Sequence, residues 1–284
     1  MSPNSSAAPP PPGLIRRLQV GDGEIVVEEQ GTGDPLLLVH GFPFDRRMWR
    51  GQIGAFPGLR LLRPDLRGHG ESEAQPPPYT LVDLAEDLRQ ILDHLAIERV
   101  LLGGLSMGGY IALAFAGRYP ERLQALLLLD THPKADPPEV RSGRAETAAR
   151  ARREGVPKLA DELTERFVGG RTMDPEVVAL IRQMILDTSV EGMVGSLTAM
   201  AARPDSTPIL PTITCPTLVI VGTEDNITPP AMAREMRAAI PNAELVEIPG
   251  AGHLAPLEAP APVNAAIAAF LRAHGLGPGR PHPA

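Results

Sequence analysis

The segment Gly104-Leu105-Ser106-Met107-Gly108 constrains this chain more than any other part of the sequence. The apolar run before it, residues 99–102, predicts a buried strand, and residues 110–116 after it predict a helix. A Gly-x-Ser-x-Gly sequence on such a sharp strand-to-helix turn holds the serine in a strained conformation with its hydroxyl exposed. The pattern therefore predicts an α/β protein with a nucleophilic serine at the end of a central strand.

Alternating strands and helices extend on both sides of this turn. Apolar runs predict strands at residues 24–29, 35–40, 59–65, 99–102, 123–130, 216–222 and 243–248, and helical spacing predicts helices at residues 81–95, 110–116, 231–240 and 262–273. Continuous apolar runs such as residues 35–40 suit strands buried on both faces, whereas the weak alternation at residues 24–29 is typical of an edge strand. The order predicts a mainly parallel, doubly wound sheet with helices on both faces.

This alternation is interrupted once, because residues 138–203 have an almost entirely helical pattern with three breaks. We expect about four helices there, forming a cap inserted into the sheet domain. Residues 1–13 are rich in proline and lack the basic start and apolar core of a secretory signal. The expected divisions are a disordered lead-in (1–13), a core (14–133 and 208–274), a helical cap (134–207) and a disordered tail (275–284).

The composition excludes several classes of partner. The chain has 284 residues, is 43% hydrophobic and has a formal net charge of −7 without a basic stripe, which argues against binding to nucleic acid or anionic membranes. No apolar stretch approaches the roughly 20 residues of a membrane span. The single cysteine, Cys215, cannot form an internal disulfide, which favours a reducing, cytoplasmic location, and it lies far from any Cys/His cluster that would predict a metal site. The composition leaves the oligomeric state open.

Three chemically distinct side chains follow three of the predicted strands. Ser106 follows residues 99–102, Asp225 follows residues 216–222, and His253 lies in a glycine-rich turn after the last strand. The carboxyl ends of parallel strands share one edge of a sheet, where ligands bind. A serine hydroxyl needs a nearby base, here His253, and that imidazole needs a carboxylate to fix its tautomer. Asp225 is the favoured carboxylate; Asp130, at the end of the preceding sheet strand, is the alternative.

The remaining site residues are predicted from their positions beside these strand ends. The backbone N–H groups of Met107 and Phe42 are the expected donors to an oxyanion, because Met107 begins a helix and Phe42 follows the strand that ends at His40-Gly41. The pocket is expected to include His40, Gly41, Phe42, Met107, Phe167, Ile227 and Leu254. The arginines Arg141, Arg144, Arg150, Arg152 and Arg153 alternate with glutamates, which predicts a solvated helix face.

Five motifs in order carry a family resemblance: His40-Gly41-Phe42-Pro43, the loop at residues 65–72, Gly104–Gly109, Gly222-Thr223-Glu224-Asp225, and Gly250-Ala251-Gly252-His253. With them the chain, over about residues 14 to 273, resembles the α/β hydrolase family, and within it the small bacterial carboxylesterases close to 3-oxoadipate enol-lactonases. The resemblance implies an α/β-hydrolase fold, a helical cap, hydrolysis of short-chain esters and no cofactor. An aspartate in place of Ser106 would have indicated a dehalogenase or an epoxide hydrolase.

The sequence therefore predicts a serine esterase that acts on a small-molecule ester through an acyl-enzyme. Three alternatives stay open. The first is a lactonase acting on an anionic enol-lactone, whose pocket should hold an arginine. The second is a cofactor-free perhydrolase, and the third is a hydrolase-fold protein that binds a ligand or signals without turnover.

Overall fold

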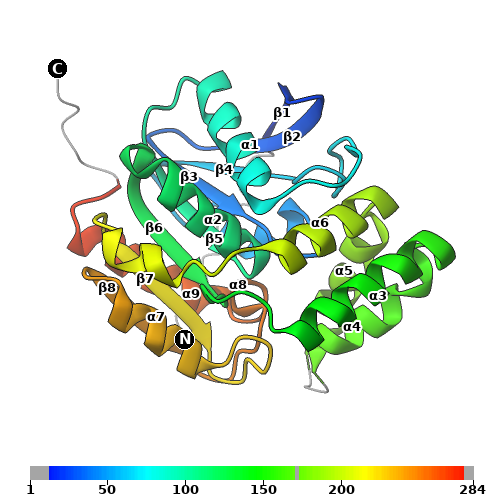
Figure 1. Cartoon of the computed structure of the whole chain (residues 1–284). Helices are drawn as coiled ribbons and strands as arrows, with labels where there is room; N and C mark the ends of the chain where they lie inside the picture. The colour runs from blue at the N-terminus through cyan, green and yellow to red at the C-terminus, as the bar shows by residue number, and fades with distance from the viewer. Residues whose placement is uncertain (1–12, 170–172, 278–284) are drawn as a thin grey trace, which may run out of the picture.

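An eight-stranded sheet runs through the molecule, with its strands in the order β1-β2-β4-β3-β5-β6-β7-β8 (Figure 1). This computed structural model describes residues 13–169 and 173–277. The strands are β1 (Leu14–Val20), β2 (Gly23–Gln30), β3 (Asp34–Val39), β4 (Leu59–Pro64), β5 (Val100–Leu105), β6 (Leu123–Leu129), β7 (Thr217–Gly222) and β8 (Ala243–Ile248). Strands β3 to β8 are mutually parallel, and only β1 and β2 introduce antiparallel pairs. The predicted mainly parallel sheet is confirmed.

The edge-strand prediction for residues 24–29 is wrong. Strand β1 pairs with β2 along its whole length, from Leu14 opposite Glu29 to Val20 opposite Gly23, so β1 forms the edge instead. Sequence patterns missed β1 because most of its side chains are exposed, including Leu14 and Ile15, and a strand outside the core lacks a clear apolar alternation.

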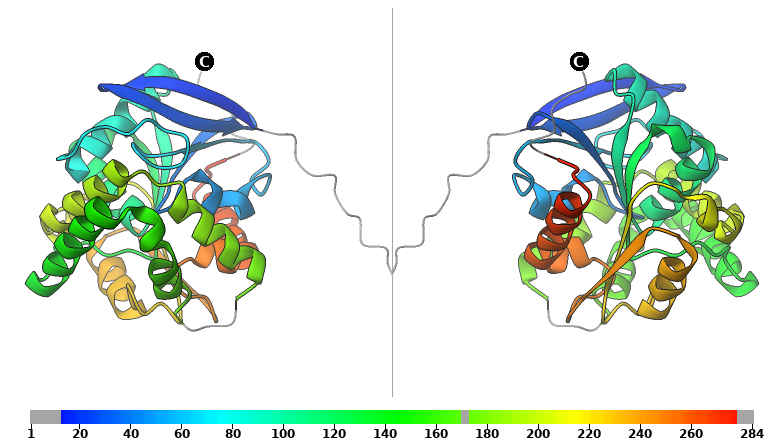
Figure 2. Two further views of the ribbon diagram at one scale, coloured as in Figure 1. Left: turned by 90° about the vertical axis from the view of Figure 1, so that its right-hand side faces the viewer. Right: turned by 90° about the vertical axis from the view of Figure 1, so that its left-hand side faces the viewer.

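Helices cover both faces of the sheet. The helical segments around it are η1 (Arg46–Gln52), α1 (Leu81–His94), α2 (Met107–Arg118), η2 (Pro120–Arg122), η4 (Thr207–Thr212), α7 (Pro230–Ala239), α8 (Ala255–Glu258) and α9 (Pro260–Ala273). Figure 2 shows α1, α2 and α7 on one face, and η1 with α9 on the other. Strands β5 and β7 are buried along their full length because helices lie on both sides of them.

Helix α1 illustrates how local sequence sets an element's start. Thr80 and Asp83 form a capping box: the Thr80 hydroxyl accepts from the Asp83 amide, and the Asp83 carboxylate accepts from the Thr80 amide at 2.7 Å. Leu84, Leu88 and Ile91 then recur at helical spacing and are buried against the core. A cap and an apolar stripe together place this helix on the sheet.

The chain between β6 and β7 contains four longer helices: α3 (Pro138–Glu154), α4 (Ala160–Val168), α5 (Pro175–Leu186) and α6 (Val190–Ala202), with the short turn η3 (Val156–Lys158). Within its described residues this stretch contains no strand, in line with the helical pattern of the sequence. We call α3 to α6 the inserted helices. They lie together beside one end of the sheet, where α3 packs on α6 and α4 on α5 (Figure 1).

Two further expectations concern the ends of the chain and membranes. The predicted disordered segments, residues 1–13 and 275–284, lie outside the described residues except for Gly13 and residues 275–277. Across residues 13–169 and 173–277, no helix combines the length and apolar character that crossing a bilayer requires.

Candidate active site

Ser106 occupies the turn between β5, which ends at Leu105, and α2, which begins at Met107. Its backbone has φ 53° and ψ −114°, a conformation that non-glycine residues rarely adopt. A Cβ atom added to Gly104 would lie 2.2 Å from the carbonyl oxygen of Gly108, and one added to Gly108 would lie 2.2 Å from that of Val39. Glycine at these two positions therefore lets the strand and the helix pack closely enough to form the turn.

The structure brings Ser106, His253 and Asp225 together. The Ser106 Oγ lies 2.9 Å from His253 Nε2, and His253 Nδ1 lies 2.9 Å from Asp225 Oδ2. Ser106 follows β5, Asp225 follows β7 and His253 follows β8, so three separate strand ends supply the three groups. Because the carboxylate can only accept, His253 Nδ1 carries the proton and Nε2 is free to accept from the serine hydroxyl.

Asp225 is held as a carboxylate by its hydrogen bonds. Its Oδ1 accepts from the backbone amides of Ile227 and Thr228 at 2.8 and 2.9 Å, and its Oδ2 accepts from the Thr228 hydroxyl at 2.6 Å. Burial alone raises the pKa of Asp225, but the interactions with His253 and Thr228 outweigh it and bring that pKa to about 2. A fixed negative charge is what a neighbouring imidazole needs when it takes up a proton.

The alternative carboxylate, Asp130, has different partners. Its Oδ1 accepts from the Gly222 amide at 2.9 Å and its Oδ2 from the Ala255 amide at 3.1 Å, so it joins the end of β7 to the start of α8. Burial, and then the nearby charge of Asp225, raise the pKa of Asp130 well above its usual range. Asp225, and not Asp130, forms the hydrogen bond to His253.

The two backbone amides predicted as oxyanion donors flank Ser106. Met107 is the first residue of α2, so its N–H points out of the helix end, where the dipole favours negative charge. Phe42 follows Gly41, and a Cβ atom added to Gly41 would lie 3.4 Å from Ser106 Cβ. For the part of the chain that the structure describes, neither amide donates a hydrogen bond to another group. Neither N–H group is therefore engaged by another group of the described chain, as an oxyanion donor requires.

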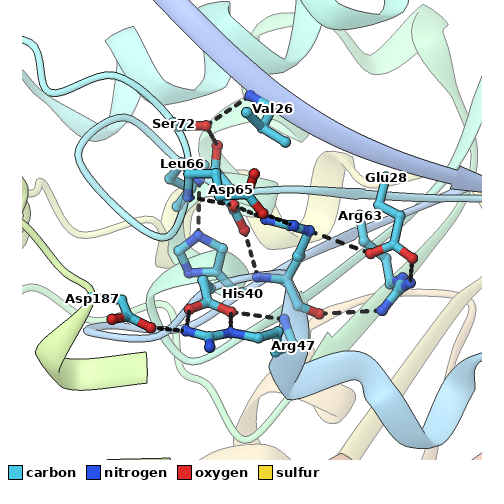
Figure 3. Close-up of polar contacts among 12 residues, drawn as sticks. Val26, Glu28, His40, Arg47, Arg63, Asp65, Leu66, Ser72 and Asp187 are labelled. Carbon is cyan, nitrogen blue, oxygen red and sulfur yellow. Dashed lines mark hydrogen bonds and ion pairs between the residues drawn. The ribbon is translucent and has the colours of Figure 1, made fainter. Parts of the chain in front are cut away.

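His40 holds the loop after β3, which contains Gly41 and Phe42, in place. Its Nδ1 donates to the Gly41 carbonyl oxygen at 2.9 Å. Its Nε2 accepts from the Leu66 amide at 2.9 Å (Figure 3). Burial, with the neighbouring His69 as a second cause, lowers the pKa of His40 to about 3. A neutral imidazole with both nitrogens engaged acts as a structural link between the loops after β3 and β4.

A buried ion-pair network fixes the same two loops, and Figure 3 shows its labelled members Glu28, Arg63 and Asp65. The Asp65 carboxylate accepts from the Arg46 amide at 2.8 Å and the Glu71 amide at 2.9 Å, and it pairs with the Arg46 guanidinium. Arg46 also pairs with Glu28 at 3.3 Å, on strand β2. The start of η1 is thereby held both to the loop after β4 and to the sheet.

A cavity of about 430 Å³ lies over Ser106 and His253, between the end of the sheet and the inserted helices. Of the predicted pocket residues, Phe42, Phe167 and Ile227 line it, and the Phe167 ring stacks on His253 with 6.1 Å between ring centroids. The structure places the other predicted pocket residues outside this lining: His40, Gly41, Met107 and Leu254. His40 and Leu254 are fully buried within the core behind it.

The sequence did not single out the cavity's polar wall. Tyr110 of α2 and Arg144 of α3 are polar lining residues, and the thioether of Met200 on α6 lies beside Arg144. The solvated-face prediction is wrong for Arg144, which is half-buried against the cavity and paired with the buried Asp136. The spacing of Val140, Arg144 and Thr147, all of which line the cavity, is the signal on α3 that marks one helix face.

Comparison with known proteins identifies the family. The model of the α/β hydrolase fold matches residues 34–260. The chain belongs to the α/β hydrolase family. Among curated relatives of this hydrolase, 3-oxoadipate enol-lactonase 2 of Acinetobacter baylyi is 31% identical over 228 residues, covering 79% of this chain and 84% of the relative.

Two solved structures extend the comparison. The malate-bound structure of a thermophilic esterase from Thermogutta terrifontis superposes with a TM-score of 0.87 at 43% identity, covering 92% of this chain and 99% of that one. The enol-lactonase of Burkholderia xenovorans gives a TM-score of 0.83 at 33% identity, covering 90% and 100%. The resemblance to esterases and enol-lactonases predicted from the motifs is confirmed.

Proposed function

We propose that this α/β hydrolase is a serine hydrolase that cleaves short-chain carboxylic esters through an acyl-enzyme. One observation carries the proposal: the hydrogen-bonded series Ser106–His253–Asp225 opens into a cavity of about 430 Å³, a volume that suits a small ester. The 43% identity to an esterase supports the same reaction class.

In this mechanism the Ser106 oxygen attacks the ester carbonyl carbon while His253 Nε2 takes the hydroxyl proton. The amides of Phe42 and Met107 donate to the oxygen that becomes negative. The imidazolium, stabilised by Asp225, then returns the proton to the leaving alcohol, and the acyl group stays on Ser106. A water molecule then gives a proton to His253 and attacks the acyl carbon; the bond between that carbon and Ser106 Oγ breaks, the acid leaves, and His253 returns the proton to Ser106.

The inserted helices fit the role of a cap over this reaction. Phe167 of α4 covers the His253 ring, and Leu197 and Met200 of α6 form part of the cavity wall. A wall of this kind excludes bulk water from the acyl group and limits the length of the acyl chain.

The test is the hydrolysis of p-nitrophenyl butyrate by purified protein. We expect Ser106→Ala to lower kcat/KM by at least about 10³-fold, since removal of a triad nucleophile costs that much or more. The matched control is Ser142→Ala, at an exposed position on α3, which should keep full activity. A loss smaller than 10³-fold in a folded Ser106→Ala protein would refute the proposal, and a wild-type protein without turnover would favour a binding role.

A lactonase remains the second candidate, and a specific observation favours it. An enol-lactone that carries a carboxylate requires a cation in the pocket, and Arg144 lines the cavity. The 31–33% identity to two enol-lactonases points the same way. Lactone and ester hydrolysis share the same attack at Ser106, so the two candidates differ in substrate and not in machinery.

A further inference from the structure

The charged side chains that line the cavity over Ser106 are Glu146, Glu162 and three arginines, of which Arg144 is the most buried; hydrolysis of a neutral ester requires none of these cations. Arg144 lines this cavity, and its side chain keeps only 18% of its exposure. Removing a guanidinium from water is costly unless it is paired, so the position of Arg144 in the wall of this cavity calls for a partner. Asp136, the carboxylate that pairs with Arg144, balances its charge only in part.

Asp136 is shared between two arginines. Arg144 Nε lies 2.5 Å from Asp136 Oδ2, and Arg203 Nη1 lies 2.8 Å from Asp136 Oδ1. Among residues 13–169 and 173–277, no other carboxylate pairs with either guanidinium. One anion therefore faces two cations, and this cluster carries a surplus positive charge at the cavity wall.

Arg144 also has a donor that is weakly engaged. Its Nη1 contacts the Met200 sulfur at 3.3 Å, and a thioether is a poor hydrogen-bond acceptor. Met200 itself lines the cavity, so a stronger acceptor placed there can take over this donor. Behind it, the Arg203 guanidinium lies 4.1 Å from the centre of the Tyr110 ring, which adds positive charge directly behind the cavity surface.

The other arginines at the cavity lack this combination. Arg150 pairs with Glu162 at 3.0 Å and with Glu154 at 3.7 Å, which neutralises its charge locally. Arg166 of α4 is exposed to solvent, where an ionic contact is worth little. Among the cavity arginines that the structure describes, only Arg144 combines partial burial, a carboxylate shared with a second arginine, and a donor that a stronger acceptor can take over.

We propose that Arg144 binds a free carboxylate on the substrate, so that the preferred substrates are monoesters of short dicarboxylic acids or the corresponding lactones. The Nε and Nη2 groups of Arg144 already donate to Asp136, which leaves Nη1 to donate to a substrate carboxylate, and such charged hydrogen bonds are stronger than neutral ones. This inference rests on the proposed function, because the ester or lactone bond of the same molecule must reach Ser106.

The first test compares monomethyl glutarate with dimethyl glutarate, followed by acid release in a pH-stat. The two esters differ only in whether the second carboxyl group is free. We expect wild type to prefer the monoester, and Arg144→Met to lower the ratio of kcat/KM for monoester over diester by about tenfold or more. Arg144→Lys, which keeps the charge but not the fork, should retain part of the ratio.

The choice of variants separates recognition from folding. In Arg144→Met the buried Asp136 still pairs with Arg203, so no isolated charge remains. Arg141→Met, at an exposed position on the same helix, should leave the ratio unchanged. An unchanged ratio in Arg144→Met, or a fall in Arg166→Met instead, would overturn the assignment of the carboxylate to Arg144.

A binding measurement distinguishes failure of this inference from failure of the proposed function. Glutarate is titrated calorimetrically into Ser106→Ala, which needs no turnover. The inference predicts saturable binding that weakens about tenfold in the double variant Ser106→Ala/Arg144→Met. Absence of binding, or binding that is equal in both proteins, contradicts the carboxylate site even if esters are hydrolysed.

Discussion

Two carboxyl groups compete for the role beside His253, and their hydrogen bonds separate them. Both follow parallel strands that are neighbours in the sheet, β6 and β7, so strand order alone cannot choose between them. Asp225 accepts from His253, whereas both oxygens of Asp130 accept from backbone amides. Both carboxyl groups are buried, but the hydrogen bonds of Asp225 bring its pKa to about 2, whereas the pKa of Asp130 is raised.

At this scale we predict that Asp225→Asn lowers kcat for p-nitrophenyl butyrate by about 10³- to 10⁴-fold, because the amide leaves His253 in the wrong tautomer. Asp130→Asn should retain at least about 100-fold more activity than Asp225→Asn, since it alters a backbone link and not the imidazole. Circular dichroism of both variants controls for folding. Equal losses of kcat in two folded variants would count against Asp225 as the catalytic carboxylate.

At the scale of elements, the loop that contains Phe42 leads into η1, and Arg46, the first residue of η1, anchors that loop. Arg46 is 9% exposed. It pairs with Asp65 in the loop after β4 and with Glu28 on β2. Burial raises the pKa of Asp65 to about 6, although Arg46 opposes that rise. The stability that Asp65 contributes is therefore present at low pH and is lost as the pH rises through about 6.

We predict that Arg46→Met lowers the free energy of unfolding by about 3 kcal/mol at pH 8, because it leaves the buried Asp65 carboxylate without its cation. The loss should be smaller at pH 4, where Asp65 takes up a proton and needs no counter-ion. Urea denaturation at the two pH values measures the difference.

Arg50→Met is the matched control, since Arg50 is exposed on the same helical segment. It should change stability by less than about 0.5 kcal/mol at either pH. If Arg46→Met lost the same free energy at pH 4 and pH 8, the buried Arg46–Asp65 pair would not be the anchor of this loop.

Across the whole molecule, the inserted helices are attached to the loops that form the site. The Thr188 hydroxyl donates to the Pro43 carbonyl oxygen at 3.0 Å, and the Ser189 amide donates to the Gly68 carbonyl oxygen at 2.9 Å. Arg47 joins Asp187 at 2.6 Å, a contact seen in Figure 3. The segment between α5 and α6 is thus fixed to the loops after β3 and β4. These contacts hold the inserted helices over Ser106, and the cavity lies between them.

The sequence predicts those parts of this arrangement whose signals are local. Ser106 and the strands around it follow from a turn motif and apolar runs, and His253 follows from a glycine-rich turn after the last strand. Strand β1 has no local signal, because its side chains are mostly exposed. Arg144 reads as one arginine of a solvated face because the groups that define its role, Asp136 and Arg203, meet only in three dimensions.

The central claim is that folding turns Ser106 into a nucleophile by bringing His253 and Asp225 to it from other strand ends. The most direct measurement is labelling with a fluorophosphonate, followed by peptide mass spectrometry. The account predicts a single adduct on Ser106 in the native protein, slowed at least about 100-fold by His253→Ala and absent in urea. An adduct on another serine, or equal labelling of Ser106 in native and unfolded protein, would contradict it.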